Sequence, residues 1–307
     1  MVALGHPIKL ADWRQSGNWF QHRGHTIFYR EDGDGVPLLC IHGFPTASWD
    51  WQRVWSALTQ HNRVLAPDMI GFGFSAKPRD HLYSISGQAS LHEELLALRG
   101  IDRVHLLVHD YGDTVAQELL ARHLERGVAR TAGPDLQSVC FLNGGLFPET
   151  HRARFVQRLL ASPIGPLLGR LTTERSFRGS FAAIFGPATQ PSREELRDFW
   201  QLVSGNGGRR IMHKLIGYME ERRRQRERWV GALQQTSVPL RLINGALDPV
   251  SGRHMAERYR ELVPDPDVVS LAEIGHYPQV EAPEAVLEAY LEFRDRLELK
   301  RGPVDSQ

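Results

Sequence analysis

The segment Val108–Asp113 indicates a chemistry most directly, because it places Asp110 between a strand pattern and a helix pattern. Residues 103–108 form an apolar run typical of a buried strand, and residues 114–120 have the composition of a helix. A nucleophile at such a strand–turn–helix junction is exposed above the sheet. A carboxylate is ionised at neutral pH and attacks an alkyl carbon without a base, which favours epoxide or carbon–halogen substrates over esters. The alternative interpretation is that Asp110 only caps the following helix.

Two backbone N–H groups near this junction are candidates for an oxyanion hole. The motif His42-Gly-Phe-Pro45 directly follows an apolar run at residues 37–41. Beside a strand–turn–helix junction of this kind, an oxyanion is stabilised by two backbone N–H groups. One belongs to the residue after His-Gly, and the other belongs to the residue after the nucleophile. The residues in these positions are Phe44 and Tyr111. The alternative for His-Gly-Phe-Pro is an ordinary strand-to-loop turn.

Two further polar residues follow strand patterns in the chain order that a nucleophile–acid–histidine triad requires. Asp248 lies in Asn-Gly-Ala-Leu-Asp-Pro after residues 238–243, and His276 lies in Ile-Gly-His-Tyr-Pro after residues 268–271. Alone, Asp-Pro opens many turns, and one histidine among 14 is more often a surface or core residue. Three such residues in this order, each after its own strand, are much harder to obtain by chance. We therefore interpret Asp110, Asp248 and His276 as a catalytic triad.

The expected reaction follows from the charge of the nucleophile. Because Asp110 attacks without deprotonation, His276 instead takes a proton from the water that cleaves the resulting ester. Asp248 orients His276 and stabilises the imidazolium, and the oxyanion on Asp110 faces the N–H groups of Phe44 and Tyr111. The scheme requires water and a small apolar organic substrate, an epoxide or a haloalkane. It requires no cofactor and no metal.

The leaving group separates the two kinds of substrate. An opening epoxide develops an alkoxide that needs a proton donor, whereas a departing halide needs no proton and is stabilised by N–H donors. Tyr218 is the only tyrosine between residues 112 and 258, and it lies in a helical segment. We therefore predict Tyr218 as the proton donor. Packing on an amphipathic helix is the alternative role.

The elements that must position these residues alternate along the first part of the chain. Strand patterns occur at residues 18–30 (two short antiparallel strands meeting at Gly24), 37–41, 63–66, 104–108 and 137–142. Helix patterns occur at residues 48–59 and 86–98. This βαβα order indicates an α/β fold with a mostly parallel sheet covered by helices on both faces.

The pattern changes between residues 146 and 236, where the sequence is basic and helical. Ser192-Arg-Glu-Glu195 is a capping box for a helix that ends at Val203, and residues 209–234 have a helical pattern over most of their length. In residues 221–228, glutamates interleaved with arginines predict a solvated, salt-bridged face rather than a site for anions or a membrane surface. Strand patterns return at residues 238–243 and 268–271, with helix patterns at 251–262 and 283–297.

A helical insert between two halves of an α/β core is typical of a cap over an active site. We therefore predict a core formed by residues 1–145 and 237–307, with a helical cap, residues 146–236, inserted after the sixth strand. The predicted class is an α/β-hydrolase fold.

Composition limits the setting in which the chain acts. A net charge of +1 argues against a dedicated nucleic-acid-binding protein. Cys40 and Cys140 lie in apolar runs and provide neither a disulfide framework nor a metal site, which favours a reducing compartment. The N-terminus lacks a signal-peptide pattern, and no apolar run approaches the ~18 residues of a membrane span. We therefore expect a cytoplasmic protein; the sequence leaves the formation of a homo-oligomer open.

The chain resembles the aspartate-nucleophile α/β-hydrolases, a group that includes epoxide hydrolases and haloalkane dehalogenases. Within that group it is similar to the mesoderm-specific transcript proteins and their bacterial relatives. The resemblance covers nearly the whole chain and implies a capped α/β-hydrolase with Asp110, Asp248 and His276 as its triad. It rests on residues 42–51, 71–75, 109–119, 143–152, 228–233 and 276–281.

Departures from the family patterns leave the substrate open. Epoxide hydrolases usually have tryptophan after the nucleophile, where this chain has Tyr111, and usually use two cap tyrosines, where we find only Tyr218. Fluoroacetate-type dehalogenases follow the nucleophile with arginines, which Tyr111 and Thr114 do not match. Haloalkane dehalogenases commonly have an amide side chain at the positions of Phe44 or His109. An epoxide hydrolase-like enzyme is the leading hypothesis; a haloalkane dehalogenase and a weakly catalytic binding or scaffolding protein are the alternatives.

Overall fold

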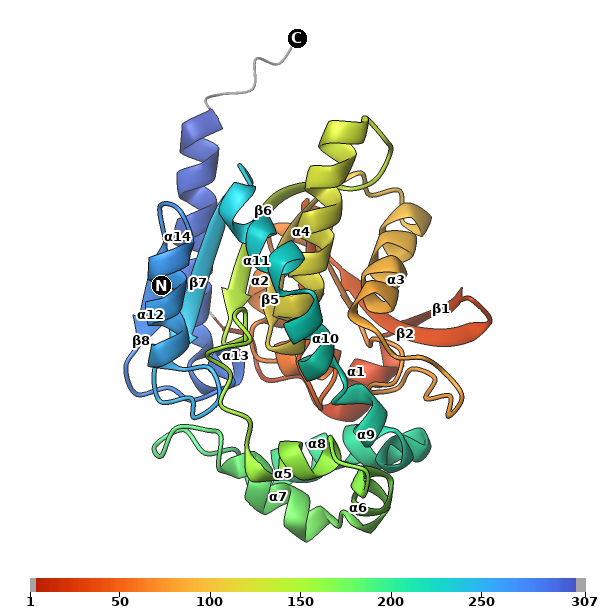
Figure 1. The fold of residues 1–307 in the computed structure, drawn as a ribbon. Helices are drawn as coiled ribbons and strands as arrows, with labels where there is room; N and C mark the ends of the chain where they lie inside the picture. The colour runs from red at the N-terminus through yellow and green to blue at the C-terminus, as the bar shows by residue number, and fades with distance from the viewer. Residues whose placement is uncertain (1–3, 302–307) are drawn as a thin grey trace.

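An eight-stranded sheet runs through the centre of the computed structural model, which describes residues 4–301 (Figure 1). The strands are β1 Asn18–His22, β2 His25–Asp32, β3 Val36–Ile41, β4 Asn62–Pro67, β5 Arg103–His109, β6 Asp135–Leu142, β7 Leu240–Gly245 and β8 Val268–Leu271. Their order in the sheet is β1-β2-β4-β3-β5-β6-β7-β8. β2 pairs antiparallel with β1 and β4, and the other neighbours pair in parallel. The predicted α/β fold with a mostly parallel sheet is confirmed.

The register of the central strands explains how distant segments meet. Ile41 pairs with Val108, and Leu142 pairs with both His109 and Ile243. The carboxyl ends of β3, β5, β6 and β7 therefore lie at one edge of the sheet, where the loops that follow them begin side by side. These strands are apolar and buried on both faces, as expected for parallel strands with helices above and below.

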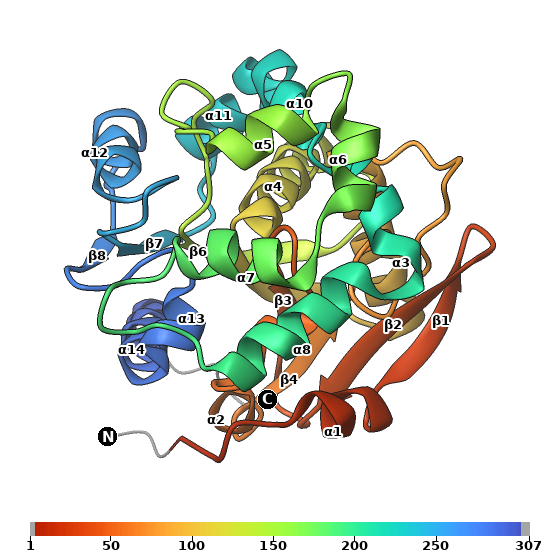
Figure 2. The same ribbon diagram turned by 90° about the horizontal axis from the view of Figure 1, so that it is seen from below.

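Helices cover the two faces of the sheet (Figure 2). One face carries α3 Ile85–Leu98, α4 Tyr111–Ala129 and α12 Arg253–Leu262; the other carries α1 Leu10–Gln15, α2 Trp55–Leu58 and α14 Pro283–Arg301. The short helices η1 Ser48–Trp51 and α13 Pro278–Glu281 lie in loops. Within residues 4–301, no helix combines the length and apolar character needed to cross a membrane.

Every element between β6 and β7 is a helix. These are α5 Phe155–Leu160, α6 Gly165–Leu171, α7 Glu174–Ala182, α8 Arg193–Ser204, η2 Gly205–Arg210, α9 Met212–Leu215, α10 Tyr218–Arg224 and α11 Arg226–Gln235. Helices α5–α8 lie beyond the carboxyl edge of the sheet, whereas α11 runs back along α4 (Figure 1). Ser192 caps α8 with the predicted capping box. The ends of the predicted core, residues 1–3 and 302–307, lie outside the described residues.

One predicted helix is broken in the structure. Residues 48–59 form the separate helices η1 and α2; all four residues of η1 are buried, and the Asp50 carboxylate accepts a hydrogen bond from Thr46 (2.6 Å). Residues 209–234 are helical over most of their length, as predicted, and cover the end of η2 and the separate helices α9, α10 and α11. Gly217, a poor helix former, separates α9 from α10, and a turn at Gln225 separates α10 from α11.

Candidate active site

Asp110 occupies a sharp turn between β5 and α4. Its backbone has a φ of 48° and a ψ of −102°, a conformation that costs energy for a residue other than glycine. The turn is held by the Asp110 N–H, which donates to the Leu142 carbonyl at 3.1 Å. A side chain at Gly112 would collide with the carbonyl oxygen of Ile41, so close packing of α4 against β3 requires glycine there. The predicted strand–turn–helix junction therefore presents Asp110 at the carboxyl edge of the sheet.

The two carboxylate oxygens of Asp110 have different surroundings. Oδ2 accepts a hydrogen bond from the Phe44 N–H at 3.0 Å, and Oδ1 lies 3.9 Å from Nε2 of His276. The first contact is one half of the predicted oxyanion hole. The N–H of Tyr111, at the first position of α4, belongs to the group of helix N–H donors that have no carbonyl partner within the helix. One oxygen is thus held by a backbone donor, and the other faces the histidine.

His42 fixes the loop that carries Phe44. Its Nε2 accepts a hydrogen bond from the Met69 N–H (3.1 Å), so its Nδ1–H donates to the Gly43 carbonyl (2.8 Å). Burial lowers the pKa of His42 to about 4, so the ring stays neutral in this role. The position of the loop that carries Phe44 therefore depends on these two hydrogen bonds of His42.

His276 and Asp248 form a tight buried pair. Nδ1 of His276 lies 2.7 Å from Oδ2 of Asp248, and both side chains are nearly inaccessible. Burial alone would lower the pKa of His276, but the Asp248 carboxylate, its hydrogen bond and the Asp110 charge raise it to about 9. Burial alone would raise the pKa of Asp248, but the His276 charge and hydrogen bonds lower it to about 2. Each member of the pair therefore stabilises the charged form of the other, so a proton that His276 accepts at Nε2 is held as an imidazolium beside the Asp248 carboxylate.

Asn143 and Ser251, which the sequence analysis did not single out, hold Asp248 in place. Oδ2 of Asp248 accepts hydrogen bonds from Asn143 Nδ2 (3.0 Å) and Ser251 Oγ (2.7 Å), and Oδ1 accepts one from the Val250 N–H (2.7 Å). Asn143 directly follows β6 and so shares the carboxyl edge of the sheet with Asp110. That position was the available sequence signal, since polar residues at this edge converge.

His109, immediately before the nucleophile, supports the histidine from behind. Its Nε2–H donates to the backbone carbonyl of His276 at 2.8 Å, and its ring packs against that of Tyr277 with centroids 4.6 Å apart. Burial, followed by the charge of His276, lowers the pKa of His109 to about 3. His109 is therefore a neutral support for the loop that carries His276.

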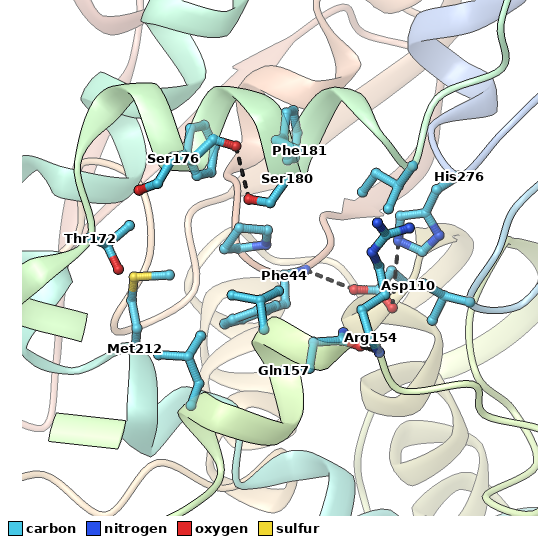
Figure 3. A pocket seen from close by; sticks show the side chains of 16 residues that line it. Phe44, Asp110, Arg154, Gln157, Thr172, Ser176, Ser180, Phe181, Met212 and His276 are labelled. Atoms are coloured by element: carbon cyan, nitrogen blue, oxygen red, sulfur yellow. Dashed lines mark hydrogen bonds and ion pairs between the residues drawn. The ribbon is translucent and has the colours of Figure 1, made fainter. Parts of the chain in front are cut away.

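A cavity of about 180 Å³ lies between this edge of the core and the cap (Figure 3). Asp110 and His276 lie at one end of it, and Thr172 and Met212 lie at the other. Most of the wall is apolar, which suits a small apolar substrate. The remaining residues of the wall are Phe44, Pro45, Arg154, Val156, Gln157, Leu160, Ser176, Phe177, Ser180, Phe181, Ile184 and Val250.

Tyr218 lies beside the site, at the first position of α10. Its ring packs against those of Tyr111 and Phe44, with centroids 4.9 and 6.0 Å apart. Burial and then the Asp110 charge raise the pKa of Tyr218, and its hydroxyl has no hydrogen-bond partner among the described residues. The described wall of the cavity does not include Tyr218. The structure thus brings Tyr218 close to both predicted oxyanion-hole residues and leaves its hydroxyl free.

Within the basic run at residues 221–228, Arg222 and Glu221 depart from the predicted solvated face. Arg222 is 1% exposed, donates from Nε (3.1 Å) and Nη2 (2.7 Å) to Thr114 Oγ1, and lies over the ring of Tyr218 at 4.9 Å. Oε2 of Glu221 accepts a hydrogen bond from the Ile85 N–H (3.0 Å). The rest of the run agrees with the prediction: Arg223 to Gln225 are exposed, and Arg226 and Arg228 form ion pairs with glutamates. Arg222 differs because that side of α10 packs against α4 of the core.

Sequence comparisons place the chain among hydrolases. A family model described as alpha/beta hydrolase fold matches residues 36–283. The mesoderm-specific transcript protein of Mus musculus is 42% identical over 295 residues, which cover 92% of this chain and 87% of the mouse protein. A putative hydrolase, LipZ, of Mycobacterium tuberculosis is 40% identical over 281 residues, which cover 91% of this chain and 96% of that protein.

Structural comparison gives the same fold. The haloalkane dehalogenase DatA from Agrobacterium tumefaciens C58 superposes with a TM-score of 0.77 at 22% identity, over 92% of this chain and 97% of the dehalogenase. At that identity the likeness concerns the fold and leaves the reaction to be argued from the site.

Proposed function

We propose that this chain, which belongs to the alpha/beta hydrolase fold family, is a hydrolase that forms an alkyl-enzyme ester on Asp110 and acts on epoxides. The observation that carries the proposal is the environment of the Asp110 carboxylate. Its Oδ2 is bound by the Phe44 N–H, its Oδ1 lies 3.9 Å from Nε2 of His276, and Asp110 lines one end of the cavity. An ionised carboxylate in this position attacks an alkyl carbon, because it needs no base to become nucleophilic.

In the first step, Oδ1 of Asp110 attacks one carbon of the epoxide. The carbon–oxygen bond of the ring breaks, its electron pair stays on the epoxide oxygen, and that oxygen takes a proton. Tyr218 is the proposed donor, because its free hydroxyl belongs to a ring packed on Phe44 and Tyr111. The apolar wall of the cavity excludes water from the alkyl carbon and so favours the carboxylate as nucleophile.

In the second step, water attacks Cγ of the Asp110 ester while Nε2 of His276 takes its proton. The oxyanion forms on Oδ2, against the N–H groups of Phe44 and Tyr111. The Cγ–Oδ1 bond then breaks, and the alcohol oxygen takes the proton from His276. The carboxylic acid left on Asp110 loses its proton, and the Tyr218 phenolate regains one, so the nucleophile and the donor are both restored. Esterification also prepares the base, because it removes the Asp110 charge, one of the causes that raise the pKa of His276.

A haloalkane dehalogenase is the second candidate, and one observation favours it. The described wall of the cavity lacks the Tyr218 hydroxyl, and expulsion of a halide needs no proton donor. A panel of aliphatic and aryl epoxides, tested beside chloro- and bromoalkanes for diol formation and halide release, separates the two reactions.

The ester mechanism is tested by a single turnover in H₂¹⁸O with enzyme in excess. The diol oxygen added in the first turnover comes from Oδ1 of Asp110, so the product is unlabelled and the peptide that contains Asp110 gains one ¹⁸O. Label in the product of that first turnover would instead mean direct attack by water and would refute the ester on Asp110.

The proposed organisation and setting follow the sequence analysis. The proposed core is residues 1–145 and 237–307, of which the structure describes 4–145 and 237–301, and the proposed cap over the cavity is residues 146–236. Cys40 and Cys140 are buried and unpaired, which is compatible with a reducing compartment, so the cytoplasm is the proposed location.

A further inference from the structure

The front cap segment, defined here as α5 and α6 with the residues between them (155–171), exposes large apolar side chains. Phe155 is 75% exposed, Ile164 53%, Leu167 57% and Leu171 63%. Val156, beside Phe155, is 42% exposed. Single exposed apolar residues are ordinary, but five within 17 residues on two helices packed against each other form a patch that marks a binding surface. This segment lies on the outer side of the cap, away from the sheet (Figures 1 and 2).

Helix α6 is amphipathic in the reverse sense of an ordinary surface helix. Ile164, Leu167 and Leu171 are spaced three and four residues apart and lie on its exposed face. The face toward the protein carries Gly165 and Gly169, where a side chain would collide with the carbonyl oxygens of Leu160 and Arg209. Packing within the cap therefore uses the glycines, and the apolar stripe has no use inside the described fold.

The same region carries a strong positive charge. Residues 151–180 contain six arginines and one acidic residue, Glu174. Within residues 4–301 only Arg178 of these arginines has an ion-pair partner, Glu174 at 3.6 Å. Arg152, Arg158 and Arg170 are exposed without an acidic partner in that range. Exposed apolar side chains with unpaired arginines around them suit the surface of a bilayer, where an apolar interior lies beneath a layer of anionic headgroups.

The patch also adjoins the cavity. Val156, Gln157 and Leu160 of α5 line the cavity wall, as does Thr172 directly after α6. An apolar molecule at the outer surface of this patch would therefore lie close to the wall of the cavity that contains Asp110.

We propose that the front cap segment docks on the surface of an anionic phospholipid bilayer, with Phe155, Ile164, Leu167 and Leu171 inserted among the lipids and the arginines at the headgroups. A second copy of the chain fits less well, because a two-fold interface would place the unpaired arginines of both copies against one another. The inference goes beyond the proposed reaction, and vesicle binding is measured without turnover, so each stands or falls separately.

The test is flotation of the full chain with vesicles of phosphatidylcholine alone or of equal parts phosphatidylcholine and phosphatidylglycerol. Binding to the anionic vesicles that weakens with salt is expected. The variant Ile164→Ser/Leu167→Ser/Leu171→Ser should lower the partition coefficient at least about tenfold, because its inserted apolar surface is lost. The variant Arg158→Gln/Arg170→Gln should lower it about fivefold for each arginine removed.

The matched control is Leu82→Ser/Leu98→Ser/Val128→Ser, which removes three exposed apolar side chains that lie outside the cap. This variant should bind vesicles like the wild type. Unchanged circular dichroism and melting temperature establish that each variant is folded. The proposal is overturned if the wild type does not float with anionic vesicles, if the α6 variant binds as well as the control, or if the chain instead self-associates through this face and the α6 variant abolishes that dimer.

Discussion

The front cap segment and the rear cap segment, defined here as α10 and α11 (residues 218–235), both contain arginines. Arginines of the rear form ion pairs, and within residues 4–301 those of the front do not. In the rear, Arg226 binds Glu149 at 2.6 Å and Arg228 binds Glu118 at 2.8 Å. In the front, Arg158 and Arg170 have no acidic partner among the described residues. The sequence is basic in both places, and only the partners differ.

This difference shows that the rear cap segment is fixed to the core by its side-chain contacts, although it lies within the cap in sequence. Glu118 lies on α4, the helix that begins directly after the nucleophile, and accepts hydrogen bonds from Arg228 and from the Trp229 indole (2.8 Å). Arg222 adds a contact to Thr114 on the same helix. The rear cap segment therefore fixes Tyr218 relative to Asp110, whereas the front cap segment presents its side chains to the exterior.

The largest expected effect lies in the core beneath both segments. His276→Gln should reduce turnover by about 10³-fold or more while leaving alkylation of Asp110 intact, because the histidine serves only the hydrolytic step. Intact-protein mass spectrometry should show a stable adduct equal to the whole epoxide, or to the haloalkane minus hydrogen halide, and peptide mapping should place it on Asp110.

The control for that experiment is Asp110→Ala, which should form no adduct and retain less than about 1% of the activity. A wild-type substrate that leaves no adduct on the His276→Gln variant would assign the histidine to the first step and contradict the covalent mechanism.

A smaller effect is expected from the chemistry that the rear cap segment contributes. Tyr218→Phe should slow the opening of epoxides by about 10²-fold, because one transition-state donor is lost, and should leave halide release unchanged. Rapid-quench measurement of the first turnover isolates this step. Tyr259→Phe is the matched control, since it also removes a buried hydroxyl without a partner in the described structure. Equal epoxide opening by the two variants would leave Tyr218 with a packing role only.

The smallest effect separates the two segments by stability. Arg228→Met should lower the free energy of unfolding by about 1 kcal/mol, because it removes partly buried charged hydrogen bonds to Glu118 and Glu125. Arg158→Met, the same substitution in the front, should change it by less than about 0.5 kcal/mol. Urea denaturation followed by circular dichroism measures both. Equal losses would remove the distinction between a docked rear and a free front.

Local patterns in the sequence predicted most elements. The apolar runs at residues 37–41, 104–108 and 137–142 correspond to β3, β5 and β6, and the Ser192 capping box begins α8 as expected. Such signals act between neighbours in the chain, through side-chain period and capping. Residues 209–234 are helical over most of their length, as the pattern predicts, but the local pattern does not show where one helix ends and the next begins.

By itself, the sequence determined the fold class and the chain order of Asp110, Asp248 and His276, because each residue follows a strand and parallel strands end at one edge. Only the tertiary structure decided which groups support them, such as Asn143 on Asp248, and which arginines are buried, paired or free. These properties depend on segments about 100 residues apart, as in the contact between Arg222 and Thr114 (|i−j| = 108). Burial and charge pairing are properties of the assembled surfaces, so no local period or turn signal encodes them.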